Sequence, residues 1–210
     1  MSLFPVFLKL EGRRCLVVGA GNVAVEKIEA LLQAGAQVSV VATRVLPRAA
    51  ALVRARRITL SLRPFRDRDV RGCALVVTAT DSHEVNQAVH HAARRAGVLC
   101  NSVDDPPNCD FYFASLVRRG SLQIAISTAG ESPALAQRLR RELEASLPET
   151  LEEWVDQLGG LRREVLARRP AGEPRKLLLH RLAHLPLCGA ESCPTRQLAA
   201  NPSSCEEALL

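Results

Sequence analysis

The chain has 210 residues, of which 47% are hydrophobic, and a formal net charge of +6 at pH 7. This is enough apolar material for a sizeable core, as one large domain or one domain with a smaller appendage. The sequence contains no apolar run long enough for a membrane span, no charged region followed by an apolar signal core, and an odd number of cysteines, seven. These features argue against a membrane protein and a disulfide framework, and they predict a cytoplasmic location.

The positive charge is concentrated in one segment. Nine arginines and only two acidic residues lie between Arg44 and Arg71, so this segment accounts for the whole excess. Such a run is most typical of a solvated helix face and loop, and the alternatives are a site for an anionic ligand or for nucleic acid. Aromatic residues make up only 3% of the chain and Phe65 is the one that stands among these arginines, so nucleic acid is not a predicted partner.

The most informative stretch is an apolar run over residues 15–18 that breaks at two glycines and continues as a helix. Gly19 can take a tight bend that a side chain would obstruct, Gly21 lets the backbone approach a pyrophosphate, and Ala24 lets the helix pack close to the strand. Phosphate charge would then lie on the free N–H groups at the positive end of the helix. We therefore predict a dinucleotide-binding turn, with a helix from about Asn22 to Ala34.

A second strand, Gln37 to Ala42, completes a βαβ unit. Sites for NAD usually carry an acid at the end of this strand, which binds the ribose hydroxyls. Thr43 and Arg44 follow this strand instead. The missing acid either relaxes the cofactor preference or lets Arg44 face a 2′-phosphate. These residues therefore do not decide whether the cofactor is NAD or NADP.

The alternation of helices and strands continues beyond this unit. We predict a helix over 47–56, strands over 58–63 and 74–79, a helix over 84–96 and a strand over 98–101. Ligands gather at the carboxyl ends of strands in such sheets, so Thr80 is expected beside the dinucleotide. Asp81 is interpreted first as the cap of the following helix, with a place near the dinucleotide as the alternative.

A proline-rich loop follows, from Asn101 to Phe113. Its two prolines and several side-chain turn formers predict a rigid loop at the carboxyl end of a strand, a position where loops carry chemistry. Asp104 and Asp105 within it are interpreted either as an ordinary Asx turn or as functional carboxylates.

The pattern changes after Phe113. We predict a strand over 121–127, with 115–119 leading into it, and a helix over 134–145. A lone strand and helix cannot bury both faces, so pairing with a second subunit is expected. Next come a helix over 151–168, interrupted at Gly159 and Gly160, and a segment of low fold content with leucine-rich turns around 177–185.

His180, His184 and Cys188 in this last segment follow a helical spacing, with Cys193 beyond them. The leucines between them explain a helix without a metal, and Pro186 interrupts it before Cys188. No metal site is predicted.

Taken together, these stretches resemble the siroheme synthase N-terminal family, which comprises precorrin-2 dehydrogenases, some of which are also sirohydrochlorin ferrochelatases. The resemblance covers residues 1–168 and rests on blocks in a fixed order. These blocks are 4–7, 19–24 with Lys27, 78–81, 85–86, 101–105, 110–111 and 126–134.

The resemblance implies an α/β fold, in which a Rossmann-type parallel sheet domain precedes a small α+β dimerisation region and a helical C-terminal domain. The expected boundaries are an NAD-binding domain over 1–113, a dimerisation region over 114–147, a helical domain over 148–170 and a low-structure tail over 171–210.

The implied reaction is oxidation of the tetrapyrrole precorrin-2 by NAD, which gives sirohydrochlorin; insertion of Fe²⁺ is a second step that the resemblance leaves open. The expected partners are this substrate and a second copy of the chain, in a homodimer. Asp104 matches the catalytic aspartate, and the turn 127–130 matches a Ser-Ser/Thr-Gly-Gly turn with Ala129 in place of a glycine.

Several further residues are expected to bind ligands. The cofactor contacts are Gly19, Gly21, Asn22, Val23, Thr43, Arg44 and Thr80, and the substrate contacts are Asn101, Ser127, Thr128, Arg118 and Arg138. The arginines are included because precorrin-2 is a polycarboxylate that basic groups attract. The rival interpretation is a dinucleotide-binding redox sensor that turns nothing over.

Overall fold

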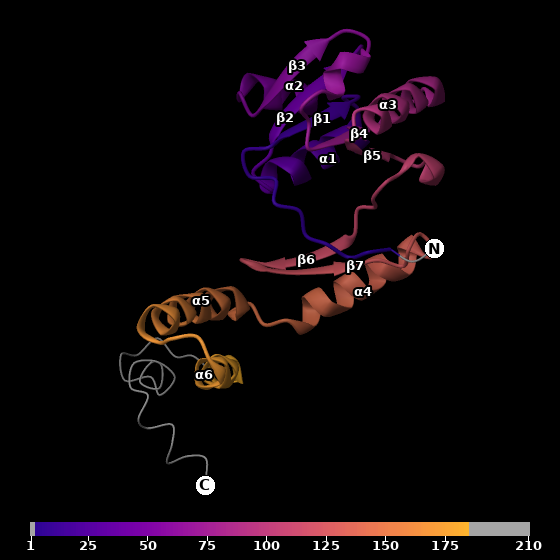
Figure 1. The fold of residues 1–210 in the computed structure, drawn as a ribbon. Coiled ribbons are helices and arrows are strands. Elements are labelled where there is room, and N and C mark those ends of the chain that lie inside the picture. Colours follow the sequence, from indigo (N-terminus) through magenta and orange to yellow (C-terminus); the bar gives the residue numbers. More distant parts are fainter. Residues whose placement is uncertain (1–2, 185–210) are drawn as a thin grey trace. The chain divides into compact units, whose positions relative to one another are not determined.

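The computed structural model describes residues 3–184, and the chain forms two compact units, residues 1–113 and 114–210 (Figure 1). The boundary falls after Phe113, where the sequence pattern changes. Cys188 and Cys193, part of the spacing considered for a metal, lie outside the described residues.

The first unit contains a five-stranded parallel sheet in the order β3-β2-β1-β4-β5. Its strands are β1 Arg14–Val18, β2 Gln37–Ala42, β3 Ile58–Leu62, β4 Leu75–Thr78 and β5 Leu99–Ser102. Val18 at the end of β1 pairs with Val41 of β2 and with Thr78 of β4. The carboxyl end of the central strand therefore lies between the carboxyl ends of its two neighbours.

Helices cover both faces of this sheet because successive strand residues point to opposite sides. Val17 packs in one core with α1 (Asn22–Gln33) and α2 (Pro47–Arg54), whereas Leu16 and Val18 pack in a second core with α3 (His83–Arg95). Two short 3₁₀ helices, η1 (Asp67–Val70) and η2 (Pro106–Asn108), lie in the connections. The predicted Rossmann-type α/β fold is confirmed.

The second unit begins with an antiparallel hairpin, β6 (Ser115–Arg119) and β7 (Leu122–Ile126), followed by α4 (Pro133–Ser146). One strand was predicted here, and the structure has two, joined by a two-residue turn with Gly120 at φ +53°. Val117 is buried where α4 packs on the hairpin, whereas Leu116 on the opposite face is exposed. A five-residue strand with two arginines gives too weak an apolar signal for sequence reasoning.

Two further helices follow, α5 (Leu151–Arg168) and α6 (Glu173–His184). α5 runs without interruption through Gly159 and Gly160, so the predicted break is wrong. The predicted low-structure tail from residue 171 is also wrong for residues 173–184, because the leucines of α6 are buried against α5. The side chains buried between the two helices are Leu161, Val165, Leu178 and Leu182.

None of the helices within residues 3–184 is both long enough and apolar enough to cross a membrane.

Candidate functional site

The glycine turn after β1 has the geometry that its sequence predicts. Gly19 has φ +112°, and its N–H donates to the Val41 carbonyl at 2.9 Å. A Cβ at Gly19 would lie only 2.2 Å from the carbonyl oxygen of Ala79. Only glycine fits here, because a side chain would meet both a forbidden φ and the backbone that follows β4.

Gly21 has a different role. It is the N-cap of α1, no side chain caps the helix, and no heavy atom lies within 4 Å of the position that a Cβ would occupy. The first amides of the helix, those of Asn22 and Val23 among them, have no intrahelical acceptor, and the first turn contains no acid. Open space in front of free N–H groups fits the pyrophosphate of a dinucleotide.

Ala24 lies in the core between α1 and β1 with 1% of its surface exposed. This burial brings the start of α1 close to the sheet, as the sequence predicts.

Thr80, a predicted cofactor contact, lies after β4 in a segment held by hydrogen bonds to Asn86. Its Oγ1 donates to Oδ1 of Asn86 at 2.8 Å, and Nδ2 of Asn86 donates back to the Thr80 carbonyl at 3.1 Å. Thr78 Oγ1 also donates to Asn86 Oδ1, at 2.6 Å. Asn86 is buried and holds the carboxyl end of β4, a role that sequence reasoning did not assign to it. A direct contact of Thr80 with the cofactor stays a prediction.

The favoured interpretation of Asp81 as a helix cap is wrong. Ser82 is the N-cap of α3, and its Oγ accepts from the Val85 N–H at 3.3 Å. The Asp81 side chain is fully exposed and lies 3.9 Å from Arg44, which follows β2 next to the exposed Thr43.

Asp104 lies in a tight turn at the end of β5. The Asp105 N–H donates to the Ser102 carbonyl at 3.1 Å, and the Val103 N–H donates to the Thr78 carbonyl at 2.9 Å. Asp104 is exposed and has φ +60°, a conformation that few residues other than Gly, Asn and Asp adopt. The turn thus fixes the backbone of the predicted catalytic residue to the end of β4.

The other two acids of the loop have structural partners. Asp105 Oδ2 accepts from Asn108 Nδ2 at 2.7 Å and lies 3.6 Å from His83 Nδ1. Asp110 Oδ2 accepts from the Cys100 N–H at 2.9 Å. Within the part of the chain that the structure describes, the first of the loop's three carboxylates is therefore the one without a hydrogen bond.

Asn101, a predicted substrate contact, is buried. Its Nδ2 donates to the Phe111 carbonyl at 2.8 Å, and its backbone forms a β-bridge with Cys109. The side chain therefore holds the two ends of the loop together. Contact with a substrate stays a prediction, and this burial does not favour it.

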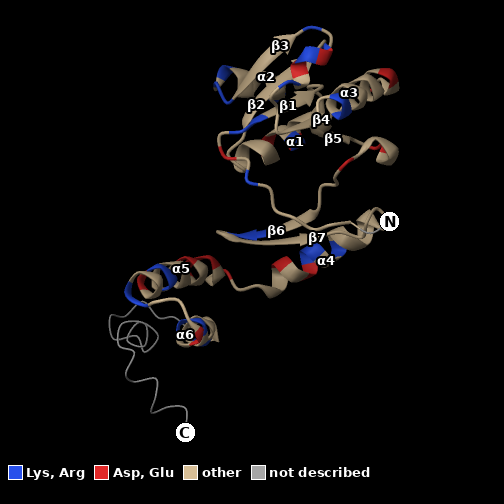
Figure 2. Ribbon diagram, viewed as in Figure 1, with Lys and Arg blue, Asp and Glu red and all other residues tan. Residues whose placement is uncertain are grey.

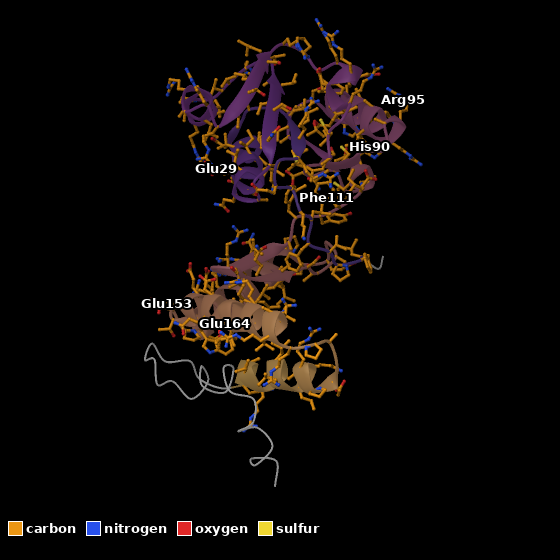
Figure 3. The ribbon with its side chains drawn as sticks, turned by 60° about the vertical axis from the view of Figure 1, so that its left-hand side comes forward. Glu29, His90, Arg95, Phe111, Glu153 and Glu164 are labelled. Atoms are coloured by element: carbon orange, nitrogen blue, oxygen red, sulfur yellow. The ribbon has the colours of Figure 1, made fainter. Side chains whose placement is uncertain are left out.

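The far end of the loop is anchored by aromatic contacts. Phe111 (labelled in Figure 3) packs against the core of the first unit, and its ring lies 5.5 Å from that of Phe113 in an edge-on arrangement. Lys27 of α1 places its Nζ 4.5 Å from the centroid of the Phe113 ring. The loop is therefore attached both to the sheet and to the helix that follows the glycine turn.

The four cysteines among the residues that the structure describes are poorly suited to nucleophilic chemistry. Burial raises the pKa of the Cys100 thiol to about 12 and that of Cys15 to about 11. Burial also raises the pKa of Cys73 and Cys109, and all four of these thiols are free. Neutral, buried thiols behave as small hydrophobic groups, not as nucleophiles.

The substrate turn predicted in the second unit is built by side-chain to backbone hydrogen bonds. Ser127 Oγ accepts from the Ala129 N–H at 3.1 Å, and Thr128 Oγ1 accepts from the Ser132 N–H at 3.0 Å. Ala129 has φ +54° and Gly130 has φ +89°. The alanine therefore keeps the left-handed conformation that a glycine would take more easily.

The two predicted substrate arginines differ in their surroundings. Arg138 Nε lies 3.2 Å from Glu142 on α4, which carries both basic and acidic residues (Figure 2). Arg118 on β6 is exposed and forms no ion pair among residues 3–184. Its neighbour Arg119 instead donates to the Glu144 carbonyl at 2.8 Å and fastens the hairpin to α4.

A cavity of about 520 Å³ lies at the opposite edge of the sheet, where β2 and β3 begin. Gln37, Ser39, Arg57 and Ile58 are among its lining residues. Ligands of open parallel sheets bind at the carboxyl ends of the strands, so we place the candidate site at the glycine turn and not in this cavity. Residues 3–184 contain no group of three or more His, Cys, Asp or Glu residues that could hold a metal.

Two family models match the chain. Residues 6–115 match a family described as putative NAD(P)-binding, and residues 119–146 match the central region of sirohaem biosynthesis proteins. The prediction of a nicotinamide dinucleotide cofactor, NAD, is thereby confirmed at the level of an NAD(P)-binding family.

Curated relatives give the same result. The chain is 40% identical over 182 residues to siroheme synthase 1 of Aeromonas salmonicida, a match that covers 87% of this chain and 39% of the relative. It is also 40% identical over 149 residues to the siroheme synthase of Nitrosococcus oceani, covering 71% of this chain and 32% of the relative. The chain therefore spans less than half the length of these relatives.

Among solved structures, the fold is similar to that of SirC, described as a precorrin-2 dehydrogenase. The TM-score is 0.73 and the identity 24%, over 99% of this chain and 97% of that one. The chain therefore belongs to the siroheme synthase N-terminal family, with an NAD(P)-binding domain followed by the sirohaem biosynthesis central region.

Proposed function

We propose that the chain is an NAD-dependent precorrin-2 dehydrogenase that forms sirohydrochlorin in siroheme biosynthesis. One observation carries the proposal: two adjacent residues at the end of β4, Thr78 and Ala79, contact both halves of the candidate site. The Ala79 carbonyl lies against Gly19, and the Thr78 carbonyl accepts from the Val103 N–H in the turn that presents Asp104. The dinucleotide-binding turn and the exposed carboxylate are thus built on the same edge of one sheet.

The proposed mechanism assigns proton removal to Asp104. When bound, NAD supplies the hydride acceptor, held by the amides at the start of α1. Oxidation also releases a proton from the substrate, and a carboxylate without a competing hydrogen bond can accept it at Oδ. The turn around Asp104 keeps this carboxylate exposed at the carboxyl edge, and Asp105 and Asp110 hold the loop in shape.

The substrate contacts proposed in the second unit are consistent with a polycarboxylate. Arg118 is exposed and unpaired within residues 3–184, and the hydroxyls of Ser127 and Thr128 line a polar turn. Arg138 would bind substrate in competition with Glu142. Charge-assisted bonds from arginine to carboxylate suit this class of ligand.

We also propose a homodimer. The hairpin face that carries Leu116 and Ala125 is exposed, and a second copy of the chain that packs on this face would bury it. Sedimentation at micromolar concentration should give the mass of two chains, and a monomer would contradict this proposal. The cytoplasmic location stays a prediction.

The decisive experiment measures NADH formation from enzymatically generated precorrin-2. Asp104→Asn keeps the shape and tolerates the positive φ of this turn, so it removes the basic oxygen with little change to the backbone. We expect the rate to fall at least about 100-fold while NADH binding is retained. Asp67→Asn, which changes an exposed carboxylate on η1, is the matched control and should keep full activity.

The rival function, a redox sensor without turnover, predicts NAD binding but no NADH from the unaltered protein.

Insertion of Fe²⁺ into sirohydrochlorin is tested at the same residue. If Asp104 serves both reactions, Asp104→Asn lowers NADH formation and iron insertion together. If the chain is only a dehydrogenase, sirohydrochlorin with Fe²⁺ is metallated at the spontaneous rate with or without the protein. An anaerobic time course of sirohydrochlorin absorbance distinguishes the two.

A further inference from the structure

An ion pair joins the two strands on either side of the glycine turn. Arg44 follows β2, Asp81 follows β4, and the guanidinium and carboxylate are 3.9 Å apart. β1 lies between these two strands, and Gly19, which follows β1, contacts the Val41 carbonyl of β2 and the Ala79 carbonyl just after β4. The pair therefore connects the two sides of the dinucleotide-binding turn.

Arg44 is the second residue after β2, in the segment where a Rossmann domain chooses between NAD and NADP. The end of the second strand lies at the adenosine ribose, where an acid favours the 2′-hydroxyl of NAD and a nearby arginine favours the 2′-phosphate of NADP. An arginine that is always charged would by itself favour NADP. This sequence has no acid after β2, and the acid that contacts Arg44 comes from the end of β4 instead.

We propose that Asp81 determines the cofactor preference of this site by occupying Arg44, so that the chain binds NAD in preference to NADP. This inference rests on the dinucleotide site of the proposed function. Asp81 acts here as a positioning residue: its carboxylate takes the guanidinium that a 2′-phosphate would need. Both side chains are almost fully exposed, so the pair adds little to folding stability, and its effect is on the ligand.

The test compares the dissociation constants of NADH and NADPH, measured from nicotinamide fluorescence on the purified full chain. The unaltered protein should bind NADH more tightly. Asp81→Asn should lower the dissociation constant of NADPH about fivefold relative to that of NADH. This change corresponds to about 1 kcal/mol, the energy of one charge interaction near 4 Å in water. Asp67→Asn removes the carboxylate of another exposed pair, with Arg95 at 2.6 Å, and should leave the ratio unchanged.

A double-mutant cycle with Arg44→Gln tests the route of the effect. In that background Asp81→Asn should change NADPH binding less than about twofold, because the group on which Asp81 acts is absent. An equal gain in both backgrounds would overturn the proposal in favour of direct repulsion between Asp81 and the phosphate.

The failures can be told apart. Tight binding of NADH with a ratio unaffected by Asp81→Asn overturns only the role of Asp81. If neither dinucleotide binds, this proposal and the dehydrogenase both fail. The predicted change in selectivity without NADH formation from precorrin-2 supports this inference and overturns the proposed activity.

Discussion

The two units of the chain bury their apolar surface in different ways. In the first, five parallel strands have helices on both faces, and two cores flank β1. In the second, a two-stranded hairpin packs on α4, and α5 and α6 share a small core of four buried side chains. The first unit can therefore hold a ligand site rigidly, whereas the second depends on a few contacts and leaves a sheet face exposed.

The sharpest way to break the first unit is at Gly19. Gly19→Ala combines a forbidden φ with a clash against the Ala79 carbonyl, so we expect a loss of about 3 kcal/mol in unfolding free energy together with loss of NADH binding. Thermal unfolding and NADH fluorescence measure the two effects.

Gly21→Ala is the matched comparison for Gly19→Ala. Gly21 has φ −80° and open space beside it, so its replacement should change stability by less than about 1 kcal/mol. The methyl group would occupy the position of the pyrophosphate, and NADH binding should weaken at least about tenfold. Similar destabilisation by both variants would contradict the separate roles of the two glycines.

The second unit should be most sensitive between its last two helices. Leu182 is 1% exposed, and Leu182→Ala should destabilise the α5–α6 pair by about 2–4 kcal/mol. Amide hydrogen exchange should show faster exchange in both helices, while NADH affinity stays unchanged. Leu177→Ala, at an exposed position of the same helix, is the control, and an equal effect of both would refute the packing.

The pH dependence of the first unit can be tested at Asp69. Bidentate hydrogen bonds of 2.7 Å from Arg63 hold the pKa of this carboxyl below its ordinary value of 3.8. A lowered folded pKa means that the stabilisation is present above the ordinary pKa and is lost as the pH falls through the folded one. Asp69→Asn should therefore lower the free energy of unfolding near pH 6. In acid titrations, the free energy of unfolding of this variant should fall less steeply below about pH 4 than that of the unaltered protein. If the stability of both proteins fell equally below about pH 4, the Arg63–Asp69 pair would not contribute to the acid dependence.

The smallest expected effect concerns the substrate turn. Ala129 has φ +54°, so Ala129→Gly relieves strain and should stabilise the second unit by up to about 1 kcal/mol in chemical denaturation. Ala125→Gly, on the exposed side of β7, should instead be neutral or destabilising. A loss of stability with Ala129→Gly would show that the turn is not strained.

Sequence reasoning was most successful where a local requirement decides the structure. Gly19 and Gly21 were assigned different roles because a bend and a close approach each require the absence of a side chain; the bend at Gly19 is seen in its positive φ, and the contact of Gly21 with a pyrophosphate stays a prediction that the open space beside it allows. It failed to predict the full length of α6 (Glu173–His184), whose leucines are buried only against α5. It also failed at Asp81, because Ser82 next to it is as good a helix cap.

The sequence by itself determined the alternation of strands and helices in the first unit, the dinucleotide-binding turn and the family, because apolar periodicity, glycine conformation and short motifs act over a few residues. Only the tertiary structure gave Asp105 its partners Asn108 and His83 and paired Arg44 with Asp81. These distinctions depend on which distant groups reach one another, such as His83 beside Asp105 or the end of β4 beside the end of β2. Hydrogen bonds and charge pairs form between neighbours in space, and the packing of five strands decides those neighbours.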